Sequence, residues 1–250
     1  ESPVSLRVIG LQEIEKAPGA NRDISRVVQN YPGVAFSPVG YRNDLIVRGG
    51  GPSENRFYLD GVEIPNINHF STQGASGGPV GLIDADLIRN VKFYSGAFPA
   101  HRGNALSSVL DFSLRDGSME RNSLKATLGA SEVSLSSNGH IGDKTSYLVS
   151  VRQSYLQMLF KVLGLPFLPA YTDASFKIKT RFNDKNELTV LGLGGLDRMK
   201  LNMDIDSEYA EYLLSYLPTI EQETFTLGGV YRHYAGNHVQ SVTLSHSYLH

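Results

Sequence analysis

The chain has 250 residues, with 23 lysines and arginines against 25 aspartates and glutamates and a net charge of −2. This balance offers no basic surface for a nucleic-acid partner, and the lack of cysteine excludes disulfides and thiolate metal sites. The 25 glycines and 13 tyrosines, with no tryptophan, favour β-structure with tight turns. No apolar run reaches the roughly 20 residues of a membrane-spanning helix.

Residues 1–117 are irregular and rich in turn-forming residues, and they predict a small α+β domain. Weak alternation over Val4–Ile9 indicates a strand, and Ile24–Gln29 indicates a short helix capped by Asn21 or Asp23. The sequence Tyr31-Pro32-Gly33 ends that helix, because proline disfavours helix at the residue before it and glycine supplies a turn. Short apolar runs follow at Leu45–Val47, Phe57–Leu59, Leu87–Tyr94 and Ser108–Leu114.

Residues 46–66, IVRGGGPSENRFYLDGVEIPN, are compatible with a phosphate loop, a catalytic loop or a hairpin. The neighbouring sequence does not match a phosphate-binding loop, because no Lys-Ser/Thr pair follows Gly49–Gly51 and the next apolar run predicts a strand instead of a helix. The G-x-S-x-G spacing at 74–78 follows a polar segment and precedes Pro79, so it predicts a flexible loop. His246 and His250 would lie about 13 Å apart on a strand. We therefore expect no enzyme, no metal site and no cofactor.

Residues 118–250 alternate with a period of two, and they predict about seven antiparallel strands. In Tyr171–Phe182 the even positions are mostly apolar, while the odd positions carry Asp173, Lys177 and other polar side chains. The segments are about 10–14 residues long, which suits tilted membrane-crossing strands. Near Ser131–Glu132 the apolar phase flips, and either a chain reversal or a bulge explains the flip.

The connections between these strands alternate in length. Short turns fall at 142–144, 183–186 and 236–237, and longer connections fall at 156–170 and 197–221, as in outer-membrane barrels. Seven strands cannot close a wide barrel, and open edges are not tolerated in lipid. The segment is therefore either part of a longer barrel or a soluble sandwich, and its strands, diluted by alanine and glycine, favour the barrel.

An ordered set of motifs in residues 1–117 resembles the plug of the TonB-dependent outer-membrane receptors. The set comprises a short helix at Asp23–Asn30 followed by Pro32-Gly33-Val34, the strand Leu45–Gly49, Leu59-Asp60-Gly61, and Gly103 with Ser108–Asp111. The residues after Asp60 resemble a subgroup in which a carboxypeptidase-regulatory-like domain often precedes the plug. Arg102-Gly103 departs from the usual tyrosine-glycine, and no TonB box is recognisable before Val4.

The resemblance implies an α+β plug domain at 1–117 followed by the first strands of an incomplete transmembrane β-barrel at 118–250. It implies a receptor of the Gram-negative outer membrane, with the plug facing the barrel lumen and the periplasm. Such a receptor imports an extracellular nutrient, either a small molecule or an oligomer, with energy from a TonB-type coupling protein. Outer-membrane lipids are further partners, and a surface lipoprotein would favour a glycan or peptide ligand.

Two groups of residues are the candidate site. By resemblance, the plug loop with Asn66, Asn68, His69 and Phe70 faces the ligand cavity, where polar groups beside an aromatic suit ligand binding. Tyr209, Tyr212 and Tyr216 fall at helical spacing, which predicts either an amphipathic helix on the barrel rim or an aromatic ligand surface. Residues expected to shape or gate the plug are Pro32, Gly33, Arg48, Gly49, Arg56, Asp60, Gly61 and Gly103.

Charges are expected to join the plug reversibly to the wall. Wall residues Arg152, Lys177, Lys179, Arg181 and Arg232 would face the lumen, and Arg48, Arg56 and Asp60 would form ion pairs within the plug or with the wall. The strands containing Arg48 and Asp60 are expected to be neighbours in one small sheet, joined by Gly49–Asn55. Two alternatives remain: a non-transporting surface-binding or signalling receptor on the same plug and barrel, and a soluble periplasmic β-rich enzyme.

Overall fold

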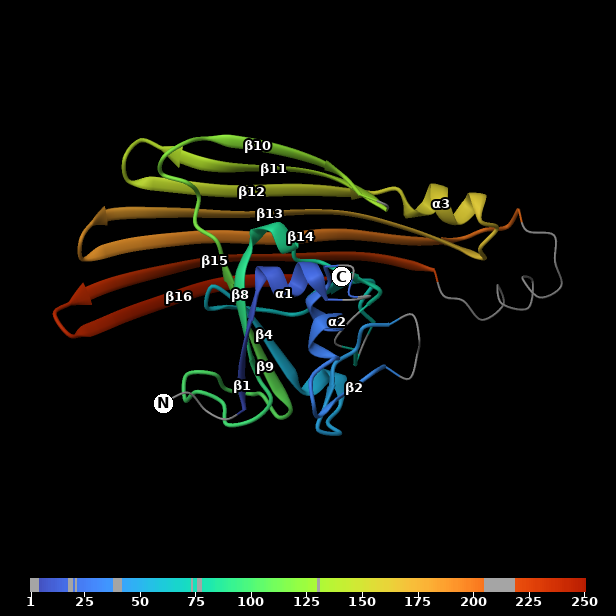
Figure 1. The fold of residues 1–250 in the computed structure, drawn as a ribbon, viewed down its shortest axis with the longest axis horizontal. Helices are drawn as coiled ribbons and strands as arrows, with labels where there is room; N and C mark the ends of the chain where they lie inside the picture. Colours follow the sequence, from blue (N-terminus) through green and yellow to red (C-terminus); the bar gives the residue numbers. More distant parts are fainter. Residues whose placement is uncertain are drawn as a thin grey trace.

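The computed structural model describes residues 5–17, 20, 22–37, 42–72, 74–75, 78–129, 131–204 and 219–250. Its two main sheets differ in size and direction, and the smaller one packs across one side of the larger (Figure 1). We call the N-terminal layer, through Asp116, the plug, and the C-terminal sheet the wall. The last plug strand ends at Leu114 and the wall begins at Ser123, so the expected domain boundary after residue 117 stays a prediction.

The plug sheet has five strands in the order β1-β8-β9-β4-β5. The strands are β1 (Leu6–Gly10), β4 (Asn55–Leu59), β5 (Val62–Ile64), β8 (Ile88–Tyr94) and β9 (Ser108–Leu114). All neighbours are antiparallel except β4 and β9, which run parallel. Buried β8 and β9 side chains, including Val91, Phe93, Leu110 and Phe112, form the centre of the plug core.

Two short helices flank this sheet, α1 (Leu11–Lys16) and α2 (Ile24–Val28). Of the two expected caps for α2, Asp23 is the one present, because its carboxylate accepts the Ser25 amide at 2.8 Å. Helix α1 was not predicted. Its N-cap, Gly10, makes no side-chain capping bond, so the sequence carries no start signal there.

Short elements complete the plug: β2 (Val34–Ala35) pairs with β3 (Ile46–Val47), and β6 (Asn68–His69) pairs with β7 (Val80–Gly81). The 3-10 helices are η1 (Pro52–Glu54) and η2 (Ala85–Leu87). The expectation that the Arg48 and Asp60 strands are neighbours is wrong. Arg48 and Gly49 have positive φ and turn the chain away after β3, while β4 is enclosed between β9 and β5.

The wall has seven strands, each antiparallel to the next, as the alternation predicts. They are β10 (Ser123–Leu128), β11 (Glu132–Ile141), β12 (Thr145–Ser154), β13 (Phe167–Asn183), β14 (Asn186–Leu201), β15 (Ile220–Ala235) and β16 (His238–Leu249). Leu128 pairs with Val133, so the phase flip there is a chain reversal and not a bulge. Helix α3 (Leu156–Val162) lies in the connection after β12, at the opposite end from the short turns (Figure 1).

The two faces of the wall differ in burial. In β13, Tyr171, Asp173, Ser175 and Lys177 are buried, whereas the alternate residues between them are half-buried or exposed. The plug covers the polar face, and the face turned away from it exposes apolar side chains such as Val151, Ile178 and Phe225. Within the described part of the chain, no helix combines the length and apolar character needed to span a membrane.

Candidate functional site: the contact between plug and wall

The inner face of the wall places charged side chains in register on neighbouring strands. Arg152 of β12 lies opposite Asp173 of β13, and Asp173 lies opposite Gly195 of β14. Asp197, two residues further along β14, lies opposite Tyr171. Because side chains alternate along a strand, these groups share the face that the plug covers.

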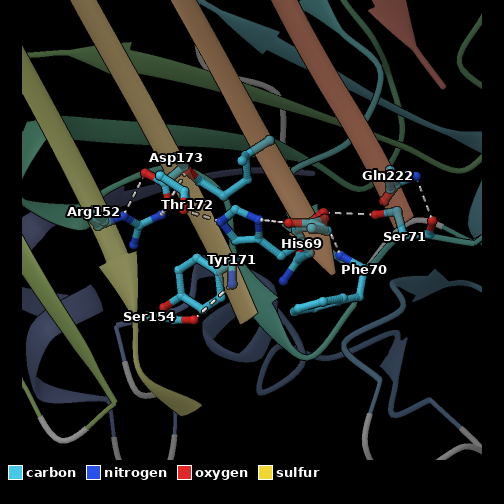
Figure 2. Close-up of polar contacts among 12 residues, drawn as sticks. His69, Phe70, Ser71, Arg152, Ser154, Tyr171, Thr172, Asp173 and Gln222 are labelled. Carbon is cyan, nitrogen blue, oxygen red and sulfur yellow. Dashed lines mark hydrogen bonds and ion pairs between the residues drawn. The ribbon is translucent and has the colours of Figure 1, made fainter. Parts of the chain in front are cut away.

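His69 of the plug inserts between two of these wall carboxylates (Figure 2). Its Nδ1 lies 2.6 Å from Asp197 Oδ1, and its Nε2 lies 2.9 Å from Asp173 Oδ2. The next residue, Phe70, has a left-handed φ of 56° and donates its amide to Asp197 Oδ2 at 2.7 Å. Three plug nitrogens therefore converge on two carboxylates, and all the side chains are buried.

Arg152 completes this cluster, which we call the upper anchor: His69, Asp173, Asp197 and Arg152. Its Nε donates to Asp173 Oδ1 at 2.9 Å, a charge-assisted hydrogen bond, and its Nη2 lies 2.9 Å from Asp173 Oδ2 as an ion pair. Nη2 also donates to the plug carbonyls of Gly81 and Leu82 at 2.8 and 2.9 Å. One wall arginine therefore orients the carboxylate that holds His69 and binds the plug backbone directly.

The room for the His69 ring comes from Gly195. A Cβ at this position would lie 3.2 Å from the His69 ring and 2.8 Å from Leu82 Cδ1, so a side chain here would require the imidazole and the end of Leu82 to shift. The Tyr171 ring stacks on the imidazole with a centroid distance of 4.2 Å, and its hydroxyl donates to Glu132 (Figure 2). Glycine and tyrosine thus form a slot for the imidazole.

The slot favours a charged imidazole. Burial alone lowers the pKa of His69, but the hydrogen bonds and negative charges of Asp173 and Asp197 together outweigh it and raise the pKa above its usual value. Both carboxylates accept only, so a ring bonded to both carries a proton on each nitrogen.

A second cluster, the lower anchor, lies nearer the short turns and consists of Lys177, Asp60 and Asp116. The Lys177 Nζ lies 3.0 Å from Asp60 Oδ2 and 2.7 Å from Asp116 Oδ1, and donates to the Leu114 carbonyl at 3.3 Å. Burial raises the pKa of Asp60, although Lys177 opposes this effect. For Asp116, burial is outweighed by Lys177 and Lys179, and its pKa is lowered.

The other predicted wall charges have mixed roles. Lys179 lies 3.0 Å from Asp116 and 3.6 Å from Glu187, so it supports the lower anchor. Arg232 pairs with Glu187 at 3.0 Å, which links two wall strands. Arg181 is exposed and makes no ion pair among the described residues.

Apolar contacts between plug and wall are close at a second glycine. A Cβ on Gly228 of β15 would lie 2.4 Å from Val62 Cγ2 of β5. The wall residues Leu148, Leu191, Leu193 and Val230 join the same buried cluster as the plug core. The interface therefore contains both ionic and apolar contacts.

The predicted ligand residues of the plug loop lie together but are all buried. Asn68 accepts from Ser25 and donates to Asp23, both at 2.8 Å, and Asn66 Oδ1 is buried without a hydrogen-bond partner among the described residues. His69 and Phe70 bind the wall as described above. A ligand role for these four residues stays a prediction. Tyr209, Tyr212 and Tyr216 lie outside the described residues.

The predicted plug-shaping residues differ in their contacts and backbone conformations. Asp60 forms the expected plug–wall ion pair, and Arg56 pairs with Glu63 inside the plug at 3.6 Å. The ion pair expected for Arg48 stays a prediction: among the described residues its side chain makes no ion pair and contacts Ser95 Oγ at 3.5 Å. The glycines at positive φ are Gly33, Gly49 and Gly61, whereas Pro32 and Gly103 are exposed loop residues.

The sequence did not single out Asp197 or Asp116 for this interface, and the contacts of Arg102 lie within the plug. Arg102, where the resemblance expects tyrosine, pairs with Asp111 at 2.6 Å and lies 4.1 Å above the Tyr58 ring. Asp197 carried a detectable signal, since it continues the inner-face alternation of β14 beyond the expected end of the strand.

A hollow of about 530 Å³ opens between plug and wall beside the upper anchor. Asp23 and Arg26 line it from the plug, and Glu132, Arg152 and Leu159 line it from the wall and α3. Its volume falls within the range of small-molecule sites, roughly 300–1,000 Å³. No cluster of histidine, aspartate or glutamate within the described ranges is arranged to hold a metal ion.

Comparison with known proteins agrees with this arrangement. Residues 1–109 match the model of the TonB-dependent Receptor Plug Domain. A mutant ferric enterobactin receptor, PfeA, of Pseudomonas aeruginosa, solved with enterobactin, is 16% identical with a TM-score of 0.68, over 99% of this chain and 41% of the receptor. No curated protein matches the chain significantly.

Two further solved structures have the same fold. The outer membrane transporter YddB of Escherichia coli is 14% identical with a TM-score of 0.66, over 96% of this chain and 38% of that protein. The alcaligin outer membrane receptor FauA of Bordetella pertussis is 16% identical with a TM-score of 0.63, over 99% of this chain and 39% of that receptor. The chain thus spans about two-fifths of the length of these structures. Residues 1–109 thus match the plug domain of TonB-dependent receptors, and the chain as a whole has the fold of the matched parts of these receptor structures.

Proposed function

We propose that the protein is an outer-membrane receptor that imports an extracellular nutrient, with the plug as its movable gate. The observation that supports this most is the ionic character of the plug–wall contact. Two buried anchors, one at His69 and one at Lys177, hold the plug to the polar face of the wall. Ion pairs and hydrogen bonds can be exchanged for water when the plug moves, whereas a dry apolar interface would resist separation.

The opposite face of the wall supports a membrane location. Its exposed residues include Val133, Leu135, Val149, Leu227 and Leu244, an apolar surface that lipid would cover. The polar inner face and apolar outer face follow from one alternating pattern, as expected for strands between a hydrated lumen and a bilayer. The Gram-negative outer membrane is the compartment that this arrangement suits.

The 530 Å³ hollow is the proposed first contact for the ligand. Helix α3 lines it at the end opposite the short turns, and it combines apolar Leu159 with the charges of Arg26 and Glu132. A ligand there would touch Arg152, which belongs to the upper anchor, so binding and plug release would share one residue. Work from a periplasmic coupling protein would then shift a two-state element, the seated or displaced plug.

The test is uptake by cells carrying the full receptor, with and without the TonB-type coupling protein, against a panel of ferric siderophores, cobalamin, oligosaccharides and peptides. We expect the receptor in the outer-membrane fraction, and one ligand class to bind in both strains but enter only the coupled strain. Uptake that is unchanged without the coupling protein would contradict the proposal. Binding without uptake in either strain would favour a non-transporting receptor.

A further inference from the structure

His69 is the one plug side chain held by two wall carboxylates among the described residues. The ring has no water-exposed edge, with 1% of its side-chain surface accessible, and each nitrogen lies within 2.9 Å of a carboxylate oxygen. A neutral imidazole has one donor and one acceptor nitrogen. In the neutral ring one nitrogen lone pair would face an anionic oxygen in a buried site, which is strongly unfavourable.

The charges of the upper anchor cancel only when His69 is protonated. Arg152 and the imidazolium supply two positive charges, and Asp173 and Asp197 supply two negative charges. Loss of the proton would leave one buried carboxylate without a counter-charge, and uncompensated buried charge is strongly destabilising. The proton is therefore part of the contact.

The surrounding titratable groups do not replace His69 in this role. On the wall, Tyr171 stacks on the ring and bonds Glu132, and Glu132 lies 3.8 Å from Arg152. On the plug, Asp23 binds Asn68, Asn43 and Ser25, and Asp84 accepts from wall Ser150 at 2.7 Å. None of these groups contacts a ring nitrogen, so the protonation of the slot depends on the imidazole itself.

We propose that His69 is a proton-dependent latch: the plug seats on the wall with a proton bound to His69, and the latch weakens as that proton is lost. A free imidazole has a pKa of about 6.5, and the seated ring holds its proton to higher pH. The latch is therefore complete below about pH 6.5 and is lost as the pH rises through the seated pKa. Between these limits, plug release becomes about tenfold easier per pH unit.

Asp197→Asn provides a matched test, because an asparagine can keep both contacts of Asp197. Its oxygen can accept the Phe70 amide, and its amide nitrogen can donate to Nδ1 of a neutral His69, which still donates from Nε2 to Asp173. The geometry is kept while the need for a second ring proton is removed. Exposed His101 of the plug supplies the control His101→Gln.

The experiment uses the full receptor in nanodiscs from pH 5.5 to 9. Hydrogen exchange of the peptide containing Phe70, corrected for intrinsic rates, reports release, and ¹⁵N NMR of labelled histidine reports protonation, with His69→Gln assigning the signal. We expect the His69 ring to remain an imidazolium above about pH 6.5. Above that pH, release should rise about tenfold per pH unit in the wild type and His101→Gln but be pH-independent in Asp197→Asn. Circular dichroism checks that the variants fold.

Three results would overturn the latch. They are a neutral His69 ring at pH 7, a wild-type release that does not vary with pH, and an Asp197→Asn protein that keeps the wild-type slope. The inference rests on the plug–wall contact alone, so it can fail while import is confirmed, and it can hold in a receptor that does not transport.

Discussion

Replacing Lys177 by methionine removes the central cation of the lower anchor and should loosen the plug. The Nζ–Oδ2 distance to Asp60 is 3.0 Å, and the side chains are 7% and 13% exposed. At an effective dielectric constant near 20, the attraction at that distance is about 5.5 kcal/mol before desolvation is subtracted. Breaking a buried pair costs about 3–5 kcal/mol, and because Asp60 can then take up a proton we expect the lower end, about 3 kcal/mol.

The assay is a urea titration of the receptor in detergent, in which the spectrum of a nitroxide attached to the plug reports plug release. These 250 residues contain no cysteine, so Lys92→Cys on the exposed face of β8 gives a single labelling site within them, and any cysteine elsewhere in the receptor is replaced by serine. With a denaturant slope of about 2 kcal/mol per molar, a loss of 3 kcal/mol moves the midpoint of plug release down by about 1.5 M. The wall strands, followed by circular dichroism, should keep their midpoint.

Lys161→Met is the matched control, since Lys161 lies 2.9 Å from Asp204 with both side chains largely exposed. Exposed pairs contribute little, and we expect no measurable shift. Asp60→Asn combined with Lys177→Met should recover part of the loss, because no buried carboxylate is then left unpaired. Equal shifts for Lys177→Met and Lys161→Met, or no recovery in the double variant, would refute the reasoning.

Three further predictions concern the same interface and use the same titration. Gly228→Ala should destabilise the seated plug by about 1–3 kcal/mol, because the added methyl group overpacks against Val62. Gly229→Ala is the control and should have no effect, because its Cβ would meet no atom within 4 Å. Equal destabilisation by the two substitutions would contradict this. Arg152→Lys should release the plug nearly as readily as Arg152→Met, because one ammonium cannot replace a guanidinium that binds Asp173 through Nε and both plug carbonyls through Nη2. A plug held as firmly by lysine as by arginine would contradict this. The pKa of Asp116 is lowered in the seated plug. Asp116 therefore stabilises the seated plug fully above the unfolded pKa of about 3.9, and this stabilisation is lost as the pH falls through the lowered pKa. Asp116→Asn should abolish this loss of stability at acid pH, and an unchanged loss in the variant would contradict the assignment.

The wall was predictable because one physical rule governs it over its whole length. Strict alternation at Tyr171–Phe182 places Asp173 and Lys177 on one face, and the structure buries both there. The plug was less predictable because its elements are short. The two-residue strand β3 carries too little pattern to specify its partner, so its pairing with β2 instead of β4 could not be deduced.

The candidate site was predicted in its parts and not in its geometry. The sequence singled out His69 and Arg152 separately, one as a ligand residue and one as a wall charge. Their connection through Asp173 depends on how the plug sheet packs on the wall, across 83 positions between His69 and Arg152, and no local pattern encodes that docking. Gly195 shows the same limit, since a glycine in a strand gives no sign of which side chain it admits.

The central claim is that the plug must leave the wall for the ligand to pass, and a reversible crosslink tests it most directly. Val62 Cβ lies 3.2 Å from the position of a Cβ on Gly228, slightly shorter than the roughly 3.8 Å of disulfides. In a receptor with Val62→Cys and Gly228→Cys, we predict normal ligand binding, no uptake when oxidised, and recovered uptake after reduction. Undiminished uptake by the fully oxidised receptor would contradict the account.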